Sequence, residues 1–383
     1  MKTEQCQWTA QRGWDRRPGR LAEAQLLLVF AHTDLLRNHH VLIEEIRDKY
    51  PGAEVLGCST AGEIRDVMVD DSTLTMTAIR FENTAVRAAC EQVSSAGSSF
   101  EVGASLSRKL LGPELAHVFV LSDGLLVNGS DLVRGLTSEL PEGVTVTGGL
   151  SGDGSRFHET LVISEGEPRP GMVSAVGFYG RQLQVGYASL GGWDSFGPER
   201  LITKSDGNIL YELDGQSALS LYRLYLGEHA RGLPSAGLLF PLQVRLPGGE
   251  PLVRTILAVD ETRQSMTFAG DMPEGGYARL MMADLDRLVD GAAGAARESC
   301  DPSLADGPDL AILISCVGRK LVLQQRVEEE VEAVRNVFGP RAVLTGFYSY
   351  GEISPFAART RCELHNQTMT ITTLREDETR RAA

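Results

Sequence analysis

The chain has 383 residues and a formal net charge of −14, and hydrophobic residues make up 42% of it. This length suits about two or three domains of ordinary size, and a negative charge without a basic stripe argues against nucleic acid as a partner. No apolar stretch reaches the roughly twenty residues that cross a bilayer, so we expect a cytoplasmic protein that does not bind a membrane.

The cysteines and histidines follow no pattern that predicts a disulfide framework or a metal site. The six cysteines include no C-x-x-C pair, and the seven histidines include no H-E-x-x-H and no helical pair at metal spacing. The chain also lacks a P-loop, a G-x-G-x-x-G fingerprint and a G-x-S-x-G elbow. We therefore expect reduced thiols and a protein that is not an enzyme, with a cysteine-dependent enzyme as the remaining catalytic alternative.

The first part of the chain predicts a flexible end followed by an α/β domain. Residues 1–20 are polar and rich in arginine, as in frayed termini. An apolar strand at residues 26–30 and a helix at 37–50 then lead to residues 57–64, which read Gly-Cys-Ser-Thr-Ala-Gly-Glu-Ile. Paired strands and another helix follow, and we place the whole domain at residues 21–165.

A second strand-helix-strand pattern lies within this domain. The apolar run 118–121 enters a Ser-Asp-Gly loop, and after a helical stretch the run 144–147 enters a glycine-rich loop that ends at Asp153. This copy therefore ends in aspartate where the first copy ends in glutamate. Residues 164–171 are rich in glycine, proline and charge, which predicts a linker between two domains.

The second domain is expected at residues 172–374, with a β-rich first part and a strand-helix-strand unit at its end. This unit has a strand at residues 310–314, a helix at about 326–338, and then residues 346–353, which read Gly-Phe-Tyr-Ser-Tyr-Gly-Glu-Ile. The octapeptide repeats the pattern found in the first domain. Residues 375–383 are again polar and are expected to form a flexible tail.

Repeats of this kind indicate duplicated strand-helix-strand units, in which two parallel strands flank a covering helix. The fold class is therefore predicted as mixed α/β, with two packed α/β domains and a β-rich middle region. Open α/β sheets bind ligands at the carboxyl ends of their strands, so the two octapeptides are interpreted as two halves of one binding crevice. The alternative is a chance similarity between glycine-rich loops.

The loops carry hydroxyls, thiols, carboxylates and a guanidinium, which are recognition groups for a small polar molecule. Paired carboxylates favour a ligand that bears an ammonium or several hydroxyls. Such a site needs no metal or cofactor. The candidate ligand-binding residues are Cys58, Ser59, Thr60, Glu63, Ser151, Asp153, Cys316, Arg319, Tyr348, Ser349, Tyr350, Glu352 and Asn366.

Several of these candidates have a structural alternative. Glu63 and Glu352 could cap a helix or brace their loops by hydrogen bonds to the backbone. Arg319 could be an exposed residue in a turn. Cys316 could be a thiolate nucleophile or a buried structural thiol, and no base for it is evident in the sequence.

The chain resembles the FIST family of bacterial sensory proteins. The resemblance implies an N-terminal and a C-terminal FIST domain and a sensor without catalysis, which binds a small ligand such as an amino acid or a related amine. It also implies signalling outputs such as histidine kinases, diguanylate cyclases or chemotaxis receptors, which this chain would reach through a separate protein. The resembling segments are Gly57–Ile64, Gly148–Gly154, Ser315–Arg319, Gly346–Pro355 and Leu364–Thr368.

Some members of the family bind haem and sense nitric oxide. A haem-binding sensor that regulates a histidine kinase or a cyclic-di-GMP enzyme is therefore the second hypothesis. Residues 348–355 read Tyr-Ser-Tyr-Gly-Glu-Ile-Ser-Pro here, whereas those members have a motif closer to Ser-Thr-Tyr-Gly-Glu-Gln. This departure weakens the haem hypothesis, and His365 is the expected axial ligand if haem binds.

Overall fold

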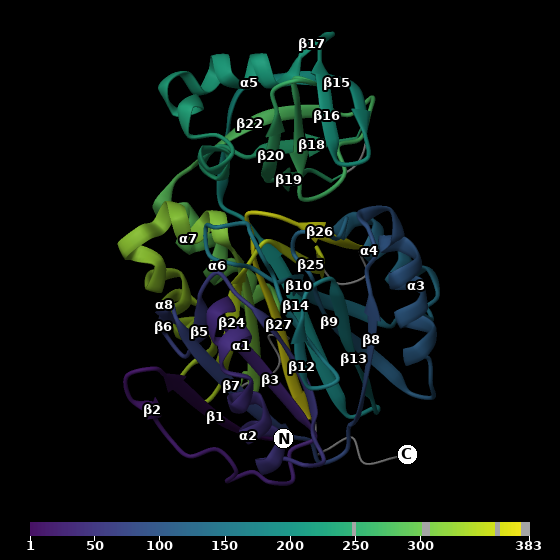
Figure 1. Cartoon of the computed structure of the whole chain (residues 1–383), viewed down its shortest axis with the longest axis vertical. Coiled ribbons are helices and arrows are strands. Elements are labelled where there is room, and N and C mark those ends of the chain that lie inside the picture. Colours follow the sequence, from purple (N-terminus) through teal and green to yellow (C-terminus); the bar gives the residue numbers. More distant parts are fainter. Residues whose placement is uncertain (247–249, 301–306, 357–360, 377–383) are drawn as a thin grey trace.

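The computed structural model describes residues 1–246, 250–300, 307–356 and 361–376. Figure 1 shows a large core and a smaller lobe, which lies at the top of the view and is formed by residues 193–283. The mixed α/β class predicted from the sequence is confirmed. None of the helices in the described ranges is long and apolar enough to cross a membrane.

Residues 2–80 form the first repeat unit of the core. Its central strand reads Leu-Leu-Leu-Val-Phe-Ala and is buried along its whole length, which is typical of a strand covered on both faces. The crossover to the next parallel strand carries the helices. The elements of this unit are β1 (Lys2–Thr9), β2 (Gly13–Trp14), β3 (Leu26–Ala31), α1 (Thr33–Asn38), α2 (His40–Lys49), β4 (Glu54–Ser59), β5 (Glu63–Arg65), β6 (Met68–Asp70) and β7 (Thr73–Arg80).

Residues 85–179 form the second unit, with the same succession of strand, crossover, parallel strand, hairpin and returning strand. The crossover helix α4 (Gly129–Ser138) begins after Asn128, whose side-chain oxygen accepts hydrogen bonds from two backbone N–H groups of the first turn. The other elements are β8 (Ala85–Gln92), η1 (Ala96–Ser98), α3 (Ser99–Leu110), β9 (Leu115–Ser122), β10 (Thr145–Leu150), β11 (Val162–Ser164), β12 (Glu167–Arg169) and β13 (Met172–Tyr179).

Residues 183–376 form the third unit, into which the lobe is inserted. Its crossover helix α8 (Val327–Phe338) ends at Gly339, where a φ of +74° places the backbone in the left-handed region that glycine adopts without strain. The other elements are β14 (Leu183–Leu190), α6 (Leu285–Glu298), β23 (Leu310–Cys316), α7 (Val317–Leu323), η4 (Gln324–Arg326), β24 (Val343–Ser349), β25 (Gly351–Pro355), β26 (Cys362–His365) and β27 (Met369–Glu376).

The lobe is an antiparallel β structure with its own hydrophobic cluster, to which Tyr222 and Phe268 belong. It corresponds to the β-rich middle region expected from the sequence. Because it has its own core, it can behave as a separate body. Its elements are β15 (Trp193–Asp206), β16 (Ile209–Leu213), β17 (Gln216–Ser217), α5 (Ala218–Leu226), η2 (Gly227–Gly232), η3 (Ser235–Leu239), β18 (Leu242–Arg245), β19 (Leu252–Arg254), β20 (Ile256–Asp260), β21 (Ser265–Phe268) and β22 (Tyr277–Ala283).

The described strands of the core form three sheets, and each sheet is completed by a hairpin from another unit. The strand orders are β12-β11-β4-β3-β7-β1-β2 in the first sheet, β26-β25-β10-β9-β13-β8 in the second, and β14-β27-β23-β24-β5-β6 in the third. The first unit gives β5–β6 to the third sheet, the second gives β11–β12 to the first sheet, and the third gives β25–β26 to the second. The units therefore exchange hairpins in a closed cycle.

This exchange explains why the octapeptide begins with glycine and ends with isoleucine. In the third sheet, Gly346 of one unit lies opposite Ile64 of another. A Cβ atom on Gly346 would lie 1.8 Å from the carbonyl oxygen of Leu313, so only glycine fits against the neighbouring strand. The equivalent pairs in the other sheets are Gly148 with Ile353 and Gly57 with Ile163. The repeated motif therefore reflects a packing requirement that the sheets share.

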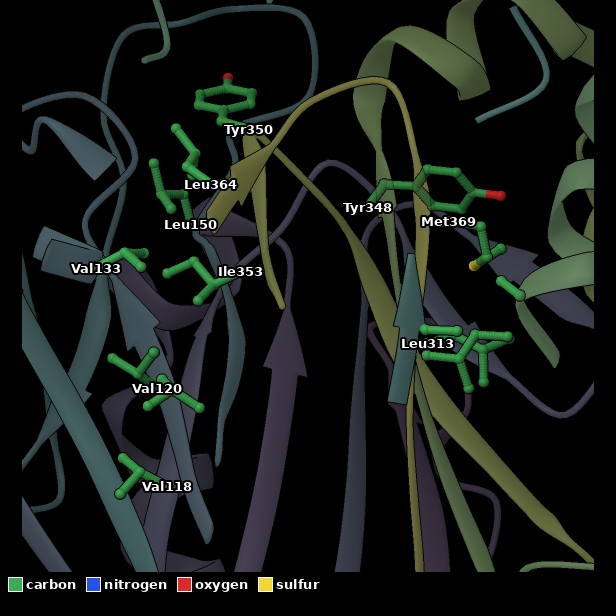
Figure 2. Packing of buried hydrophobic residues seen from close by; sticks show 14 of the residues in the cluster. Val118, Val120, Val133, Leu150, Leu313, Tyr348, Tyr350, Ile353, Leu364 and Met369 are labelled. Atoms are coloured by element: carbon green, nitrogen blue, oxygen red, sulfur yellow. The ribbon is translucent and has the colours of Figure 1, made fainter. Parts of the chain in front are cut away.

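A hydrophobic cluster in the core draws on the same strand of every unit. Leu28 of β3, Phe119 of β9 and Ile312 of β23 are each at most 1% exposed and belong to this cluster. Burying a side chain of this size contributes about 1.5–3 kcal/mol, so the packing of the sheets is a major source of stability. On the opposite face of β9, Val120 joins Val133 of α4 in a second cluster, part of which is drawn in Figure 2.

The prediction of a flexible N-terminus is wrong for residues 2–9, which form β1. This strand pairs with β7 over its whole length. Its polar side chains are satisfied within the fold, because Gln5 donates to the carbonyl oxygen of Leu344 and Glu4 accepts from the hydroxyl of Tyr50. Residues 2–9 therefore form an ordered strand although their sequence is polar.

The predicted linker is also wrong, because residues 164–171 include the turn of the β11–β12 hairpin and the approach to β13, which lies in the second sheet. The described residues from 164 to 171 therefore stay within the core. At the other end, Arg375 and Glu376 belong to β27, and the Glu376 carboxylate accepts hydrogen bonds from Glu82 N and Asn83 N. The rest of the predicted tail, residues 377–383, lies outside the described residues.

Candidate functional site

The loops that follow β4, β10 and β24 lie together, but they contact each other directly. Ala61 N donates to the carbonyl oxygen of Tyr348 at 2.8 Å, and Tyr348 N donates to that of Gly62 at 2.8 Å. The loop after β10 joins them, because Gly152 N donates to the carbonyl oxygen of Ser59 at 2.9 Å. Backbone hydrogen bonds therefore occupy the place where the sequence suggested a crevice.

Glu63 is buried within this arrangement and is fully engaged. One carboxylate oxygen accepts from the Thr60 hydroxyl at 2.5 Å, and the other accepts from the Thr73 hydroxyl at 2.7 Å and from Thr73 N at 3.1 Å. Desolvation raises the pKa of Glu63 to about 7, against the lowering effect of these hydrogen bonds. The carboxylate thus braces its own loop.

Glu352 has the same surroundings in the third unit. Its carboxylate accepts from the Ser349 hydroxyl at 2.6 Å, and from the hydroxyl and the backbone N–H of Thr368 at 2.9 and 3.2 Å. Desolvation raises the pKa of Glu352 to about 8. The structure therefore agrees with the alternative in which both glutamates brace their loops.

The second unit has no acid at this position. Glu63 and Glu352 each precede the isoleucine that pairs with a motif glycine, and the residue that precedes Ile163 is Val162. Asp153, which the sequence aligned with the glutamates, instead pairs with Arg156 in the following loop and accepts a bond from Glu159 N at 3.2 Å. The loop between the motif glycine and the paired isoleucine is longer in the second unit, so Asp153 does not reach the position of the two glutamates.

The remaining loop candidates are also engaged within the protein. The Ser59 hydroxyl donates to Gly152 O at 2.8 Å, and the Ser151 hydroxyl donates to Ser122 O at 2.9 Å. Tyr350 stacks on Phe157 with 4.4 Å between ring centroids. Figure 2 shows Tyr350 above Leu364 and Leu150, and Tyr348, which belongs to β24 of the third sheet, with its ring turned away from them.

Arg319, which was expected to hold a ligand carboxylate or to lie exposed in a turn, is instead a buried structural residue. Its guanidinium pairs with Glu330 at 2.6 Å, and both side chains are completely buried. It also donates to the carbonyl oxygens of Gly191 and Leu288 at 2.6 and 2.7 Å, while the Tyr348 hydroxyl donates to the other oxygen of Glu330 at 2.5 Å. Four of the five N–H groups of the guanidinium are therefore used in bonds within the protein.

The two candidate thiols are buried and protonated. Cys58 and Cys316 have no exposed surface. Desolvation raises the pKa of both well above the ordinary value, and neighbouring carboxylates add to the shift. Since the thiolate is the nucleophile, this environment favours the interpretation of Cys316 as a structural thiol.

His365 lies in β26 and is 2% exposed. Its Nε2 is 2.9 Å from the carbonyl oxygen of Ser354, and Phe356 packs edge-on against its ring. Desolvation lowers the pKa of His365 to about 4, so the ring is neutral and Nε2 donates this bond. That nitrogen is therefore engaged in this conformation. Within the described ranges, no group of three or more His, Cys, Asp or Glu residues is placed to hold a metal ion.

Asn366 and Gln367 join the core to the lobe. Thr255 N of the lobe donates to the Asn366 side-chain oxygen at 3.4 Å, and Gln367 Nε2 donates to Leu238 O at 3.1 Å. The indole N–H of Trp193 donates to Gln367 O at 2.8 Å. Gln367 has a φ of +63°, which is strained for a residue other than glycine. Leu364–Thr368, one of the segments that resemble the family, therefore contains the junction between lobe and core.

A cleft of about 940 Å³ opens beside this junction. It is lined by β18 and β19 of the lobe on one side and by α4, β10 and β26 of the core on the other, and Figure 1 shows β19 above β26 and α4. Its charged lining residues are Arg134, Glu142, Arg245, Glu250, Arg254, Asp271, Arg361 and Glu363. None of the loop candidates lines this cleft, so sequence reasoning missed it.

Arg254 is the most buried charged group of the cleft, with 3% of its surface exposed. Its Nη1 donates to Leu364 O of the core at 2.7 Å, and its Nε donates to Asp271 O at 3.2 Å. Desolvation lowers the pKa of Arg254 to about 10, and the nearby carboxylates of Asp271 and Glu363 oppose this shift. The sequence signal for it is weak: one arginine within residues 252–259, which read Leu-Val-Arg-Thr-Ile-Leu-Ala-Val.

Two family models match the chain. A model of the FIST N domain matches residues 25–216, and a model of the FIST C domain matches residues 218–355. The boundary between them lies inside the lobe, at β17. An uncharacterised protein of Methanocaldococcus jannaschii is 22% identical over 341 residues, which cover 82% of this chain and 64% of that protein. This chain therefore spans less than two thirds of that relative's length.

Proposed function

The chain belongs to the FIST family, and on that premise we propose that it is a non-catalytic sensor of an amino acid or a related amine, which binds in the cleft between lobe and core. FIST domains are sensory domains that bind small ligands and act in signalling proteins. The output of this chain is then a separate protein, such as a histidine kinase, a diguanylate cyclase or a chemotaxis receptor.

The observation that carries the proposal is the position of the cleft. Its walls come from the lobe and from the core, and a volume of about 940 Å³ is ample for a small polar molecule. A ligand in this place contacts both bodies at once. It can therefore favour one arrangement of lobe and core over another, by an amount equal to its difference in affinity for the two.

The junction offers a route by which such a change reaches the core. Gln367 holds the lobe through Leu238 and Thr255, and the next residue, Thr368, holds the Glu352 carboxylate. Movement of the lobe therefore acts directly on β27 and on the loop of the second octapeptide. In this proposal the glutamate loops transmit the signal and do not touch the ligand.

A thermal-shift experiment on the purified protein tests this function. The probes are the twenty amino acids, common polyamines and haemin. A ligand at about one hundred times its Kd adds about 2.7 kcal/mol to the free energy of unfolding, which raises Tm by a few degrees. We expect a shift with one amino acid or amine. A shift with haemin alone contradicts the proposal in favour of a haem sensor, and no shift with any probe contradicts small-ligand sensing of these classes.

Small-angle X-ray scattering with and without the identified ligand tests the proposed movement. The radius of gyration should change on saturation, because the lobe is joined to the core through a few side chains and strand connections. The control is the same amino acid in its D form, which differs in shape but not in charge. An unchanged scattering curve contradicts transmission through the lobe.

A further inference from the structure

Arg254 is buried without a charged partner at contact distance. No ion pair within 4.0 Å joins it to a carboxylate of the described chain, and its hydrogen bonds there are the two that it donates to carbonyl oxygens. Its Nη2 makes none of them. Burial of a charge is costly unless it is paired, so the described residues satisfy this guanidinium only in part.

Arg254 also lines the open cleft, so its position differs from that of Arg319, which is buried with Glu330. The planar fork of a guanidinium matches a carboxylate or a phosphate. Nη2 is therefore available to an oxygen atom that enters from the cleft. The chain thus places a strong, partly unused donor in the lining of the volume proposed above as the ligand site.

Two carboxylates near Arg254 restrict the kind of anion. Asp271 accepts a hydrogen bond from Asn128 Nδ2 at 2.9 Å and lies 3.6 Å from Arg134, while the Glu363 carboxylate accepts no hydrogen bond from the described residues. Arg134 and Arg361 also line the cleft, but a phosphate, with about −1.5 to −2 charges, is repelled by both acids more strongly than a carboxylate is. A carboxylate carries one charge, and a cationic group on the same molecule would be attracted to them.

We propose that Arg254 anchors the carboxylate of a small zwitterion in this cleft, with the cationic group of that ligand facing Asp271 and Glu363. This inference rests on the proposed sensor function and deepens it. It selects amino carboxylates over simple amines and polyamines, which lack the group that Arg254 binds. It also assigns the ligand contact to lobe and core residues outside both octapeptides.

Calorimetric titration of the wild-type protein with matched pairs tests the ligand chemistry. The pairs are arginine with agmatine, lysine with cadaverine, histidine with histamine, and tyrosine with tyramine, in which the second member lacks the carboxylate. For the pair that binds, we expect the acid to bind about 10-fold to 100-fold more tightly, as is typical of a hydrogen-bonded charge. Equal binding of acid and amine overturns the inference while the sensor function stands.

Two variants test the residues. Arg254→Lys keeps the charge but loses the planar fork, and it should raise the Kd of the amino acid that binds by about 10-fold or more. If this variant does not fold, as judged by circular dichroism, Glu363→Gln replaces it and should weaken the same acid through the lost attraction to its cation. The control is Arg231→Gln, an exposed lobe residue paired with Glu228 outside the cleft.

The outcomes separate the two proposals. Weaker binding in the cleft variants with unchanged binding in the control supports the site. Unchanged binding in Arg254→Lys and Glu363→Gln overturns it, although the sensor function survives. If the wild-type protein binds no member of any pair and no other amino acid or amine, the proposed function fails, and the site fails with it.

Discussion

The glutamate loops and the lobe–core cleft are both rich in polar groups, but they differ in how those groups are satisfied. Glu63 and Glu352 each accept three hydrogen bonds from hydroxyls and backbone N–H groups nearby. Arg254 is nearly as buried, yet it has no carboxylate partner among the described residues and faces an open volume. A set of polar residues in the sequence therefore indicates an internal hydrogen-bond network as readily as it indicates a binding site. A charge that the chain leaves unpaired is the better indicator.

The largest effect that we expect is on stability, at the buried ion pair between Arg319 and Glu330. Arg319→Met leaves Glu330 buried without its cation, which should lower the free energy of unfolding by about 3–5 kcal/mol. Urea denaturation followed by circular dichroism measures this change. The double variant Arg319→Met with Glu330→Leu should recover most of the loss. A folded single variant of normal stability that no longer binds ligand would return Arg319 to the ligand site.

The motif glycine gives the next largest effect. Gly346→Ala brings a Cβ atom to 1.8 Å from Leu313 O, so the strands must move apart, and we expect a loss of about 1–3 kcal/mol. The control is Gly52→Ala, where no atom lies within 4 Å of the added Cβ, and its effect should be within about 0.5 kcal/mol. Equal stability of the two variants would contradict the conclusion that sheet packing requires the glycine of the octapeptide.

Much of the core could be predicted from the sequence, because its repeats carry local signals. The strand-helix-strand units at residues 26–64 and 310–353 are recognisable from apolar runs and turn residues. The hairpin exchange could not be predicted, since a glycine of one unit pairs with an isoleucine far away in the chain. The strand at residues 2–9 was missed because its polar side chains find partners only in the assembled fold.

The candidate site was predicted less well than the fold. The sequence identified the loop residues and the segment at Asn366 but could not tell whether their polar groups have partners in the protein. Glu330, which neutralises Arg319, is one of three consecutive glutamates in the first turn of α8, and the local sequence does not single it out as the buried one. Arg254 lies in the inserted lobe, and its cleft is made by segments that are distant in sequence. Only the assembled fold places Arg254 near Asp271.

The burial of Glu63 and Glu352 also predicts the direction in which stability changes with pH. The pKa values of Glu63 and Glu352 are raised from 4.5 to about 7 and about 8, so the folded protein keeps protons that the unfolded chain releases. These two groups therefore lower stability as pH rises from about 4.5 to about 8. The slope is at most about 1.4 kcal/mol per pH unit for each group. Urea denaturation at a series of pH values should show a flatter profile when both residues are Gln, and an unchanged profile would contradict the assignment.

The smallest expected effect is that of a substitution in a glutamate loop on the affinity for the ligand. Glu63→Gln changes a side chain that is 1% exposed and does not line the cleft, so the Kd of the amino acid that shifts wild-type Tm should stay within about threefold. The variant can lose stability, because an amide N–H₂ replaces an oxygen that accepts from Thr73. Affinity must therefore be measured by calorimetry at a temperature where the variant is folded. Loss of binding in folded Glu63→Gln, with normal binding in Arg254→Lys, would reverse the comparison and place the ligand between the octapeptide loops.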